Sequence, residues 1–179
     1  MVYVFLADGF EIIEALSPVD MLRRANVETK LVGVTGEIVT SSCGVAVKTD
    51  MQIDEFDFYD VEVVVLPGGM PGTLNLENNQ TVQKIIDNAS NTNAFICAIC
   101  AAPSILGHKG LLNAKEATCF PGFENALEGA TLSDKYVVTD GKVITARGAG
   151  VSVDFGLEII KQLRGEELSN EIRSQIQCR

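Results

Sequence analysis

The sequence predicts an α/β fold: a three-layer sandwich in which a mainly parallel, doubly wound sheet carries helices on both faces. Two observations predict it. Short apolar runs rich in β-branched residues alternate along the chain with longer stretches of helical periodicity. These runs are apolar at almost every position, which is typical of strands buried on both faces. The 179 residues suit one domain, and we expect residues 1–179 to form it.

The first elements follow in order. Val2–Leu6 is a continuous apolar run and predicts a strand. A helical stretch covers 10–25, and Ser17-Pro18 inside it resembles a cap followed by proline, so we expect a kink or a restart there. Residues 30–34 predict the next strand, and the alternation over 37–48 predicts a small antiparallel excursion.

The rest of the chain repeats strand and helix. Strands are predicted at 61–66, 93–99, 117–120, 136–139 and 143–146, and helices at 81–91, 101–108 and 150–163, before a polar helix-prone tail. Thr139-Asp140-Gly141-Lys142 between the last two strands predicts a tight hairpin turn.

The composition narrows the classes of partner. A net charge of −10 disfavours nucleic acid and anionic membrane surfaces, because both repel a negative protein. No apolar run approaches the roughly 20 residues of a membrane span, and the start of the chain reads as a strand, not a signal peptide. Five cysteines without a framework spacing predict free thiols in a reducing compartment. We therefore expect a cytoplasmic protein with a small-molecule or protein partner.

One cysteine stands where a predicted strand meets a helix, at the sheet edge where ligands bind. Cys100 follows the strand at 93–99, and Ala101 and Ala102 let a helix begin at once. Such a turn resembles a nucleophile elbow with strained backbone, and a helix N-terminus beneath it would lower the pKa of the thiol. The alternative is a small buried hydrophobe, as most free cysteines are.

Two other segments supply candidate partners at the same edge. Glu11 and Glu14 share a helical face beside apolar residues, so we expect one of them to be partly buried, with a raised pKa that suits proton transfer. Two solvated acids are the alternative. Gly68 and Gly69 follow a strand and can bring backbone N–H groups close to a ligand, as an oxyanion hole requires; an ordinary turn is the alternative.

Other mechanisms are disfavoured. The one histidine, His108, stands eight residues after Cys100, roughly 12 Å along a helix, which excludes a Cys-His-Asp triad within one chain. Cys97 and Cys100 form a Cys-x-x-Cys pair, but we expect Cys97 inside the strand and on the opposite face, which disfavours a redox dithiol. One histidine and scattered cysteines disfavour a metal site, and no metal or other cofactor is expected.

These segments match a known pattern. The chain resembles the ThiJ/PfpI superfamily over residues 2–177, most closely its Parkinsonism-associated protein deglycase branch and the bacterial ThiJ-like proteins. The markers are Gly9 to Glu14 followed by Pro18-Val19-Asp20, then Val64-Val65-Leu66-Pro67-Gly68-Gly69, Ala98-Ile99-Cys100-Ala101-Ala102-Pro103 and Thr145-Ala146-Arg147-Gly148. The resemblance implies a flavodoxin-like, class I glutamine amidotransferase-like sheet arrangement.

The resemblance also implies a function. Cys100 takes the place of the family's oxidisable nucleophile and Glu14 that of its protonated glutamate, while Gly68, Gly69 and Ala101 match the backbone donors of the pocket. It implies a homodimer and cofactor-independent glyoxalase or deglycase activity on methylglyoxal or a related 2-oxoaldehyde, with a role in oxidative stress. The alternative is a non-catalytic redox sensor or chaperone that oxidises Cys100 to sulfinic acid.

The chain departs from its relatives at several positions. Ala102 stands where glycine is usual, Phe120 where several relatives carry a histidine near the pocket, and Cys43 where some have a basic residue near the dimer groove. Ala101 follows the cysteine where the protease-like branch has histidine, which argues against peptidase activity. No role is predicted for the two remaining cysteines, Cys119 and Cys178.

Overall fold

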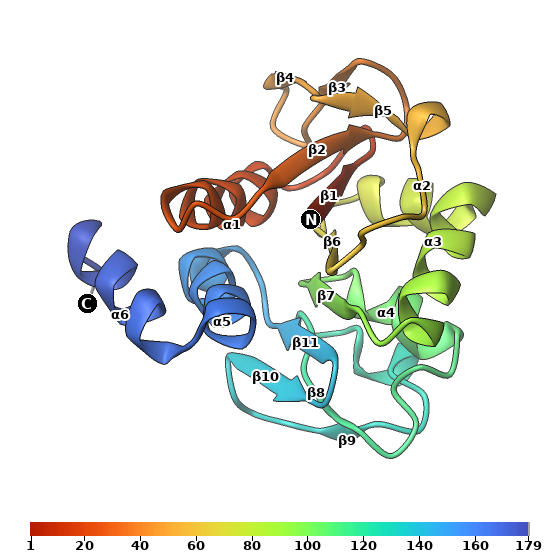
Figure 1. The fold of residues 1–179 in the computed structure, drawn as a ribbon. Coiled ribbons are helices and arrows are strands. Elements are labelled where there is room, and N and C mark those ends of the chain that lie inside the picture. The colour runs from red at the N-terminus through yellow and green to blue at the C-terminus, as the bar shows by residue number, and fades with distance from the viewer. Residues whose placement is uncertain (179) are drawn as a thin grey trace.

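The protein is described by a computed structural model that covers residues 1–178. A seven-stranded sheet lies between two layers of helices (Figure 1). Its order is β10-β11-β7-β6-β1-β2-β5. The strands are β1 (Val2–Leu6), β2 (Thr29–Gly33), β5 (Met51–Gln52), β6 (Val63–Leu66), β7 (Phe95–Ile99), β10 (Val137–Asp140) and β11 (Val143–Ala146). All neighbours pair in parallel except β10 with β11, so the predicted mainly parallel, doubly wound sheet is confirmed.

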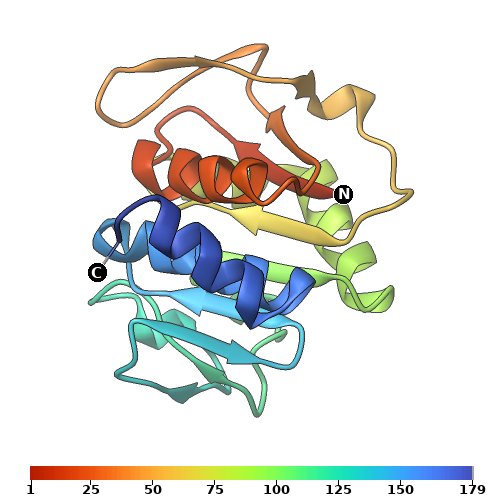
Figure 2. The same ribbon diagram turned by 60° about the vertical axis from the view of Figure 1, so that its left-hand side comes forward.

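The helices divide between the two faces of the sheet. One layer holds α1 (Ile12–Arg24), α5 (Ser152–Arg164) and α6 (Glu166–Gln175), which lie side by side in Figure 2. The other holds α2 (Gly72–Asn78), α3 (Gln80–Asn91) and α4 (Pro103–His108). Within residues 1–178 every helix is too short or too polar to cross a bilayer.

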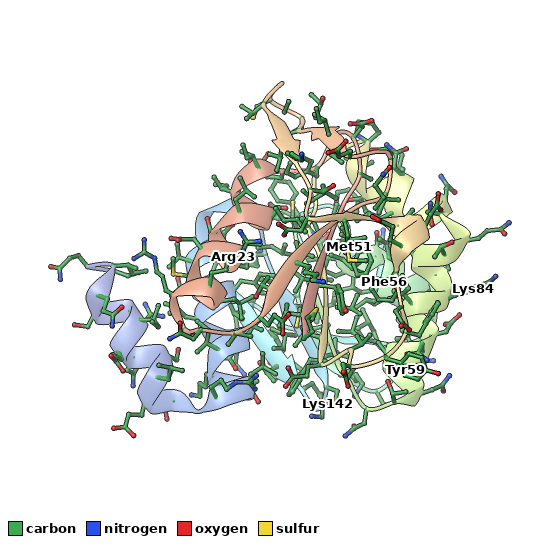
Figure 3. All side chains as sticks on the ribbon, turned by 45° about the horizontal axis from the view of Figure 1, so that its top comes forward. Arg23, Met51, Phe56, Tyr59, Lys84 and Lys142 are labelled. Atoms are coloured by element: carbon green, nitrogen blue, oxygen red, sulfur yellow. The ribbon has the colours of Figure 1, made fainter. Side chains whose placement is uncertain are left out.

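Each helix layer has its own hydrophobic core, because side chains alternate across the central strands. Val4 and Leu6 of β1 belong to the cluster beneath α1 and α5, whereas Phe5 belongs to the cluster beneath α3. Met51 and Phe56, labelled in Figure 3, pack against this second cluster. The continuous apolar runs of the sequence are therefore explained by burial on both faces.

The predicted excursion over 37–48 is confirmed as β3 (Ile38–Thr40) and β4 (Ala46–Lys48), which pair antiparallel. The hairpin at Gly141-Lys142 is also confirmed, since Asp140 pairs with Val143. The strand predicted over 117–120 is shorter: β8 (Glu116–Ala117) pairs with β9 (Thr131–Leu132), which the sequence pattern did not indicate. Three short 3-10 helices complete the described chain: η1 (Ile53–Glu55), η2 (Glu124–Ala126) and η3 (Ala149–Val151).

The expected restart at Ser17-Pro18 is wrong, because α1 runs through Pro18 without a break. Pro18 is buried where α1 contacts α5, and a Cβ added at Gly156 would lie only 2.8 Å from Pro18 Cα. Close packing between the two helices holds the backbone helical although proline donates no hydrogen bond.

The strand order identifies the edge of the sheet where a ligand is expected to bind. The chain moves from β1 to β2 in one direction and from β6 to β7 in the other, so the direction reverses between the neighbours β1 and β6. Ligands of doubly wound sheets bind beyond the carboxyl ends of strands at such a switch point. The segments that follow β1, β6, β7 and β11 all begin at this edge.

Candidate active site

Cys100 occupies the turn directly after β7. Its φ is +66°, a left-handed conformation that is strained for a residue with a Cβ. Two backbone hydrogen bonds hold the turn: the Cys100 N–H donates to the Ala146 carbonyl at 2.9 Å, and the Phe120 N–H donates to the Cys100 carbonyl at 2.8 Å. The predicted strained turn is confirmed, and the Cys100 side chain is half-buried at the end of the sheet.

Glu14 lies in the first turn of α1 and points into the molecule, where only 1% of its surface is exposed. Its Oε2 accepts the Gly68 N–H at 2.9 Å, and its carboxyl lies beside Cys100. Glu11 stands at the N-terminal boundary of α1, and its carboxylate accepts the Ser42 hydroxyl at 3.2 Å. Of the two acids, Glu14 is therefore the buried one, as expected for one member of the pair.

The surroundings of this pair set its proton chemistry. Burial raises the pKa of Glu14 to about 7, although hydrogen bonds from Cys100 and Gly68 oppose the rise. Burial and the neighbouring Glu14 charge raise the pKa of the Cys100 thiol to about 12, while the N–H groups of Ala101 and Gly69 act in the opposite direction. Two adjacent buried anions repel, so an ionised Glu14 opposes ionisation of the Cys100 thiol.

The expectation of a depressed thiol pKa is therefore wrong, because burial and the Glu14 charge both raise the pKa of Cys100. Its physical basis was a helix N-terminus directly beneath the sulfur. The structure instead begins α4 at Pro103, and this helix has only six residues. The six-residue helix α4 therefore supplies no N-terminal turn directly beneath the sulfur.

Two glycines bring the backbone close to the pair. A Cβ added at Gly68 would lie 2.7 Å from both Cys100 Cβ and Glu14 Oε2, so any side chain there would displace the pair. Gly69 has a φ of +90°, and a Cβ there would lie 2.4 Å from the Glu11 nitrogen. The Gly68 N–H is bonded to Glu14, which corrects its expected place among the oxyanion donors; the Gly69 and Ala101 N–H groups face the sulfur.

A pocket of about 460 Å³ opens beside Cys100. A Cβ at Gly148 would lie 3.9 Å from Cys100 Sγ and 3.2 Å from Phe120 Cδ2, which places the sulfur next to the pocket wall. The lining consists of Phe120, Pro121, Tyr136, Arg147 and residues 148–151. Apart from Phe120, sequence reasoning did not assign these residues to the site. Arg147 and Gly148 directly follow β11, so the rule that selected Cys100 could also have found them.

The remaining sulfur and imidazole groups lie outside this pair. Cys97 is fully buried in a hydrophobic cluster that Cys100 also contacts, so the two side chains lie on the same side of the sheet and the expected opposite orientation is wrong. The reason is the left-handed turn at Cys100, which ends the alternation of side chains along the strand. All five thiols are free.

His108 ends α4, and its Nδ1 lies 2.5 Å from Glu77 Oε1 on α2. Within residues 1–178 no three His, Cys, Asp or Glu side chains are placed to hold a metal ion.

Comparison with known proteins identifies the family. The DJ-1/PfpI family model matches residues 1–162. The chain belongs to the DJ-1/PfpI family. The dj-1beta protein of Drosophila melanogaster is 34% identical over 172 residues, which cover 94% of this chain and 92% of that protein. The Parkinson disease protein 7 homolog of Danio rerio is 32% identical over 178 residues, covering 97% and 94%. The resemblance to the ThiJ/PfpI superfamily is thereby confirmed.

Other DJ-1 relatives are longer than this chain, and solved DJ-1 structures share its fold. The chain spans 41% and 45% of the lengths of DJ-1 homologs B and A of Arabidopsis thaliana. It matches the oxidized DJ-1 of Toxoplasma gondii with a TM-score of 0.95 and 31% identity, over 99% of this chain and 97% of that one. Drosophila melanogaster DJ-1beta gives 0.94 and 32%, with the same coverages. The three-layer α/β fold is thus the DJ-1 fold.

Proposed function

We propose that the protein is a cofactor-independent glyoxalase-type enzyme that converts methylglyoxal or a related 2-oxoaldehyde into a 2-hydroxy acid. One observation carries the proposal: a buried carboxyl whose pKa is about 7 lies beside a half-buried thiol next to a pocket. A group that titrates near neutral pH both accepts and returns protons readily. Glu14 is therefore suited to act as the base and the acid for a nucleophilic Cys100.

The first step is addition to the aldehyde. The Glu14 carboxylate takes the S–H proton as Cys100 Sγ attacks the aldehyde carbon, and the N–H groups of Gly69 and Ala101 stabilise the developing oxyanion. Glu14 then returns the proton to that oxygen, which gives a hemithioacetal.

The second step moves hydrogen within the substrate. Glu14 removes the proton from the former aldehyde carbon and returns it to the neighbouring carbon through an enediol, leaving a thioester of the 2-hydroxy acid. Water hydrolyses the thioester, releasing lactate from methylglyoxal and restoring the thiol. One carbon is oxidised and its neighbour reduced, so the electrons balance inside the substrate. A deglycase reaction on adducts of the same aldehydes would use the same pair.

The test is lactate formation from methylglyoxal by the wild type, Cys100→Ser and Glu14→Gln. We expect each substitution to lower turnover by about 100-fold or more, the usual effect of losing a nucleophile or a general base. Cys43→Ser is the matched control, since Cys43 is exposed and outside the pocket lining. Full activity in Cys100→Ser or in Glu14→Gln would contradict this mechanism.

A non-catalytic redox sensor is the second candidate, favoured by the contact between the Cys100 thiol and an acid that can remain protonated. Peroxide would convert Cys100 to sulfenic and then sulfinic acid, and a proton on Glu14 would hydrogen-bond to the added oxygens. One of the similar solved structures is described as an oxidized DJ-1. Negligible aldehyde turnover, together with selective addition of two oxygens at Cys100 in mass spectrometry, would favour the sensor.

A further inference from the structure

Arg147 is the one charged side chain among the described residues that line the pocket. Its neighbours there are aromatic, aliphatic, proline or glycine residues. Arg147 directly follows β11, and the preceding carbonyl, that of Ala146, accepts the Cys100 N–H. The arginine thus stands one residue from the backbone contact that holds the reactive turn.

Arg147 forms no ion pair with a carboxylate of residues 1–178. Four of the five arginines within residues 1–178 form ion pairs with carboxylates: Arg23 (labelled in Figure 3) with Asp50, Arg24 with Asp20, Arg164 with Glu62 and Arg173 with Asp154. In the same part of the chain, Arg147 has no carboxylate within 4.0 Å. This is notable in a protein with 24 acidic and 14 basic residues. A positive charge without a carboxylate, beside a pocket, is available to a ligand.

Aromatic contact positions this guanidinium. The guanidinium carbon lies 5.8 Å from the centre of the Tyr136 ring, within the range of a cation–π contact. The backbone N–H of Arg147 donates to the Tyr136 carbonyl at 3.0 Å, which keeps the two residues together. Two carboxylates, Glu124 and Asp134, line a smaller neighbouring cavity together with Arg147. Glu124 already accepts the Gly122 N–H at 2.7 Å. These acids are the internal competitors for the arginine.

The pocket is also larger than methylglyoxal needs. Its volume of about 460 Å³ lies in the range of pockets that hold much larger ligands, roughly 300–1,000 Å³. The exposed rings of Phe120 and Tyr136 offer apolar walls. The pocket therefore has room for a substrate with an apolar or planar body and a negative group.

We propose that Arg147 selects substrates that carry an anionic group, so that the preferred substrate is a 2-oxoaldehyde bearing a carboxylate or a phosphate. This inference rests on the proposed function for the reaction and adds the substrate class. The aldehyde lies at Cys100 Sγ, and the anionic group extends to the guanidinium, which binds such groups through two parallel N–H···O bonds. Arg147 acts in specificity and takes no part in proton transfer.

The first test needs no turnover. Iodoacetate and iodoacetamide alkylate a thiol in the same way: the sulfur–carbon bond forms, iodide leaves and the thiol loses its proton. They differ in charge, since iodoacetate carries a carboxylate where iodoacetamide carries a neutral amide. We expect Arg147→Gln to slow the alkylation of Cys100 by iodoacetate about tenfold or more, as for loss of a charge-assisted hydrogen bond, and to change the iodoacetamide rate less than about threefold.

Peptide mass spectrometry assigns the alkylation to Cys100 among the five cysteines. Arg147→Lys, which keeps the charge without the paired donors, is expected to retain part of the preference. Arg24→Gln is the control, because Arg24 is paired with Asp20 on the surface of α1 and should leave both rates unchanged. Equal slowing with both reagents in Arg147→Gln would indicate a structural role and overturn the inference. A Cys100 that reacts with neither reagent would overturn it as well.

The second test compares initial rates for matched aldehydes, measured before the aldehydes modify arginine: phenylglyoxal with 4-carboxyphenylglyoxal, and hydroxypyruvaldehyde with its phosphate. We expect a higher kcat/KM for the charged member of a pair and loss of that preference in Arg147→Gln. The pair with the larger preference distinguishes carboxylate from phosphate. Turnover without dependence on Arg147 defeats the inference and leaves the proposed function standing. No turnover, with Arg147-dependent alkylation, defeats the function and leaves the anion selectivity.

Discussion

The Gly68 N–H donates to Glu14 Oε2 at 2.9 Å, and this bond holds the acid against the thiol of Cys100. Gly68 follows β6, whereas Glu14 belongs to the helix that follows β1. The two strands are neighbours in the sheet, so the switch point brings the donor and the carboxyl together. The orientation of the acid therefore depends on a residue that has no side chain.

Gly68→Ala should disable the pair without removing either member. The new methyl group would lie 2.7 Å from both Cys100 Cβ and Glu14 Oε2, closer than van der Waals contact allows. Glu14 must then turn away, and we expect turnover per folded protein to fall about tenfold or more, as positioning is lost. Steady-state kinetics with circular dichroism checks this.

Gly107→Ala is the control for general destabilisation, because its methyl group would meet the Ala126 carbonyl at the contact of α4 with η2. That variant should lose stability and keep its turnover per folded molecule. Turnover of Gly68→Ala equal to that of the wild type would show that the Gly68–Glu14 bond has no bearing on the reaction.

Glu14 should make the protein less stable as the pH rises. The pKa of its carboxyl is raised from 4.5 to about 7 in the folded state. Between these values the unfolded chain releases a proton that the folded chain retains, so stability present below pH 4.5 is lost as pH rises through 7. The loss amounts to about 3 kcal/mol. Urea denaturation of the wild type and Glu14→Gln across this range measures it.

Glutamine does not ionise, so the Glu14→Gln variant should become progressively more stable relative to the wild type from pH 4.5 to 7. Above pH 7 the difference should be constant. Two curves that stay parallel over the whole range would mean that the Glu14 pKa is not raised by burial.

Regular strands were predictable because their signal is local. The apolar runs of β1, β6 and β7 reflect burial on both faces, and the structure moves their boundaries by no more than two residues. α2 was not predicted, because it is short and begins at the end of a run of glycine and proline. The continuity of α1 through Pro18 depends on packing against α5, which no local pattern reports.

The site likewise combines features with a local sequence signal and features that depend on the assembled fold. Cys100 and Gly69 could be found from their place after strands, since the chain direction alone brings strand ends together. The bond from Gly68 to Glu14 and the raised pKa of the thiol depend on side-chain direction and burial, which follow only from the assembled fold. That Arg147 has no ion pair within the described part of the chain likewise follows only from the positions of the surrounding carboxylates in the fold.

We propose that the chain forms a homodimer through α1 and the β3–β4 hairpin. Ile13 on α1 is 46% exposed, and Ile38 and Val45 of the hairpin are 62% and 47% exposed. The Ser42 N–H donates to the Phe10 carbonyl at 2.8 Å, so the hairpin lies beside the start of α1. Exposed apolar side chains on neighbouring elements are typical of association surfaces.

Ile38→Glu should therefore shift the protein toward monomer in analytical ultracentrifugation, because two copies of the new charge would be buried in a symmetric interface. Tyr59→Glu is the control: Tyr59 is 79% exposed and lies outside α1 and the hairpin. A wild type that sediments as a monomer at all concentrations would contradict the dimer.

Phe120 should limit the rate of the proposed reaction. Its N–H donates to the Cys100 carbonyl at 2.8 Å, and its ring lines the pocket with 47% of its surface exposed. Histidine at this position would add a second proton-transfer group with an ordinary pKa of about 6.5. We expect Phe120→His to raise methylglyoxal turnover several-fold and to add an inflection to the pH–rate profile near that value, because Glu14 would no longer move every proton alone. Phe120→Asn is polar and does not titrate, so it should show neither change. If the His and Asn variants behave alike, proton transfer at this wall of the pocket does not limit the reaction.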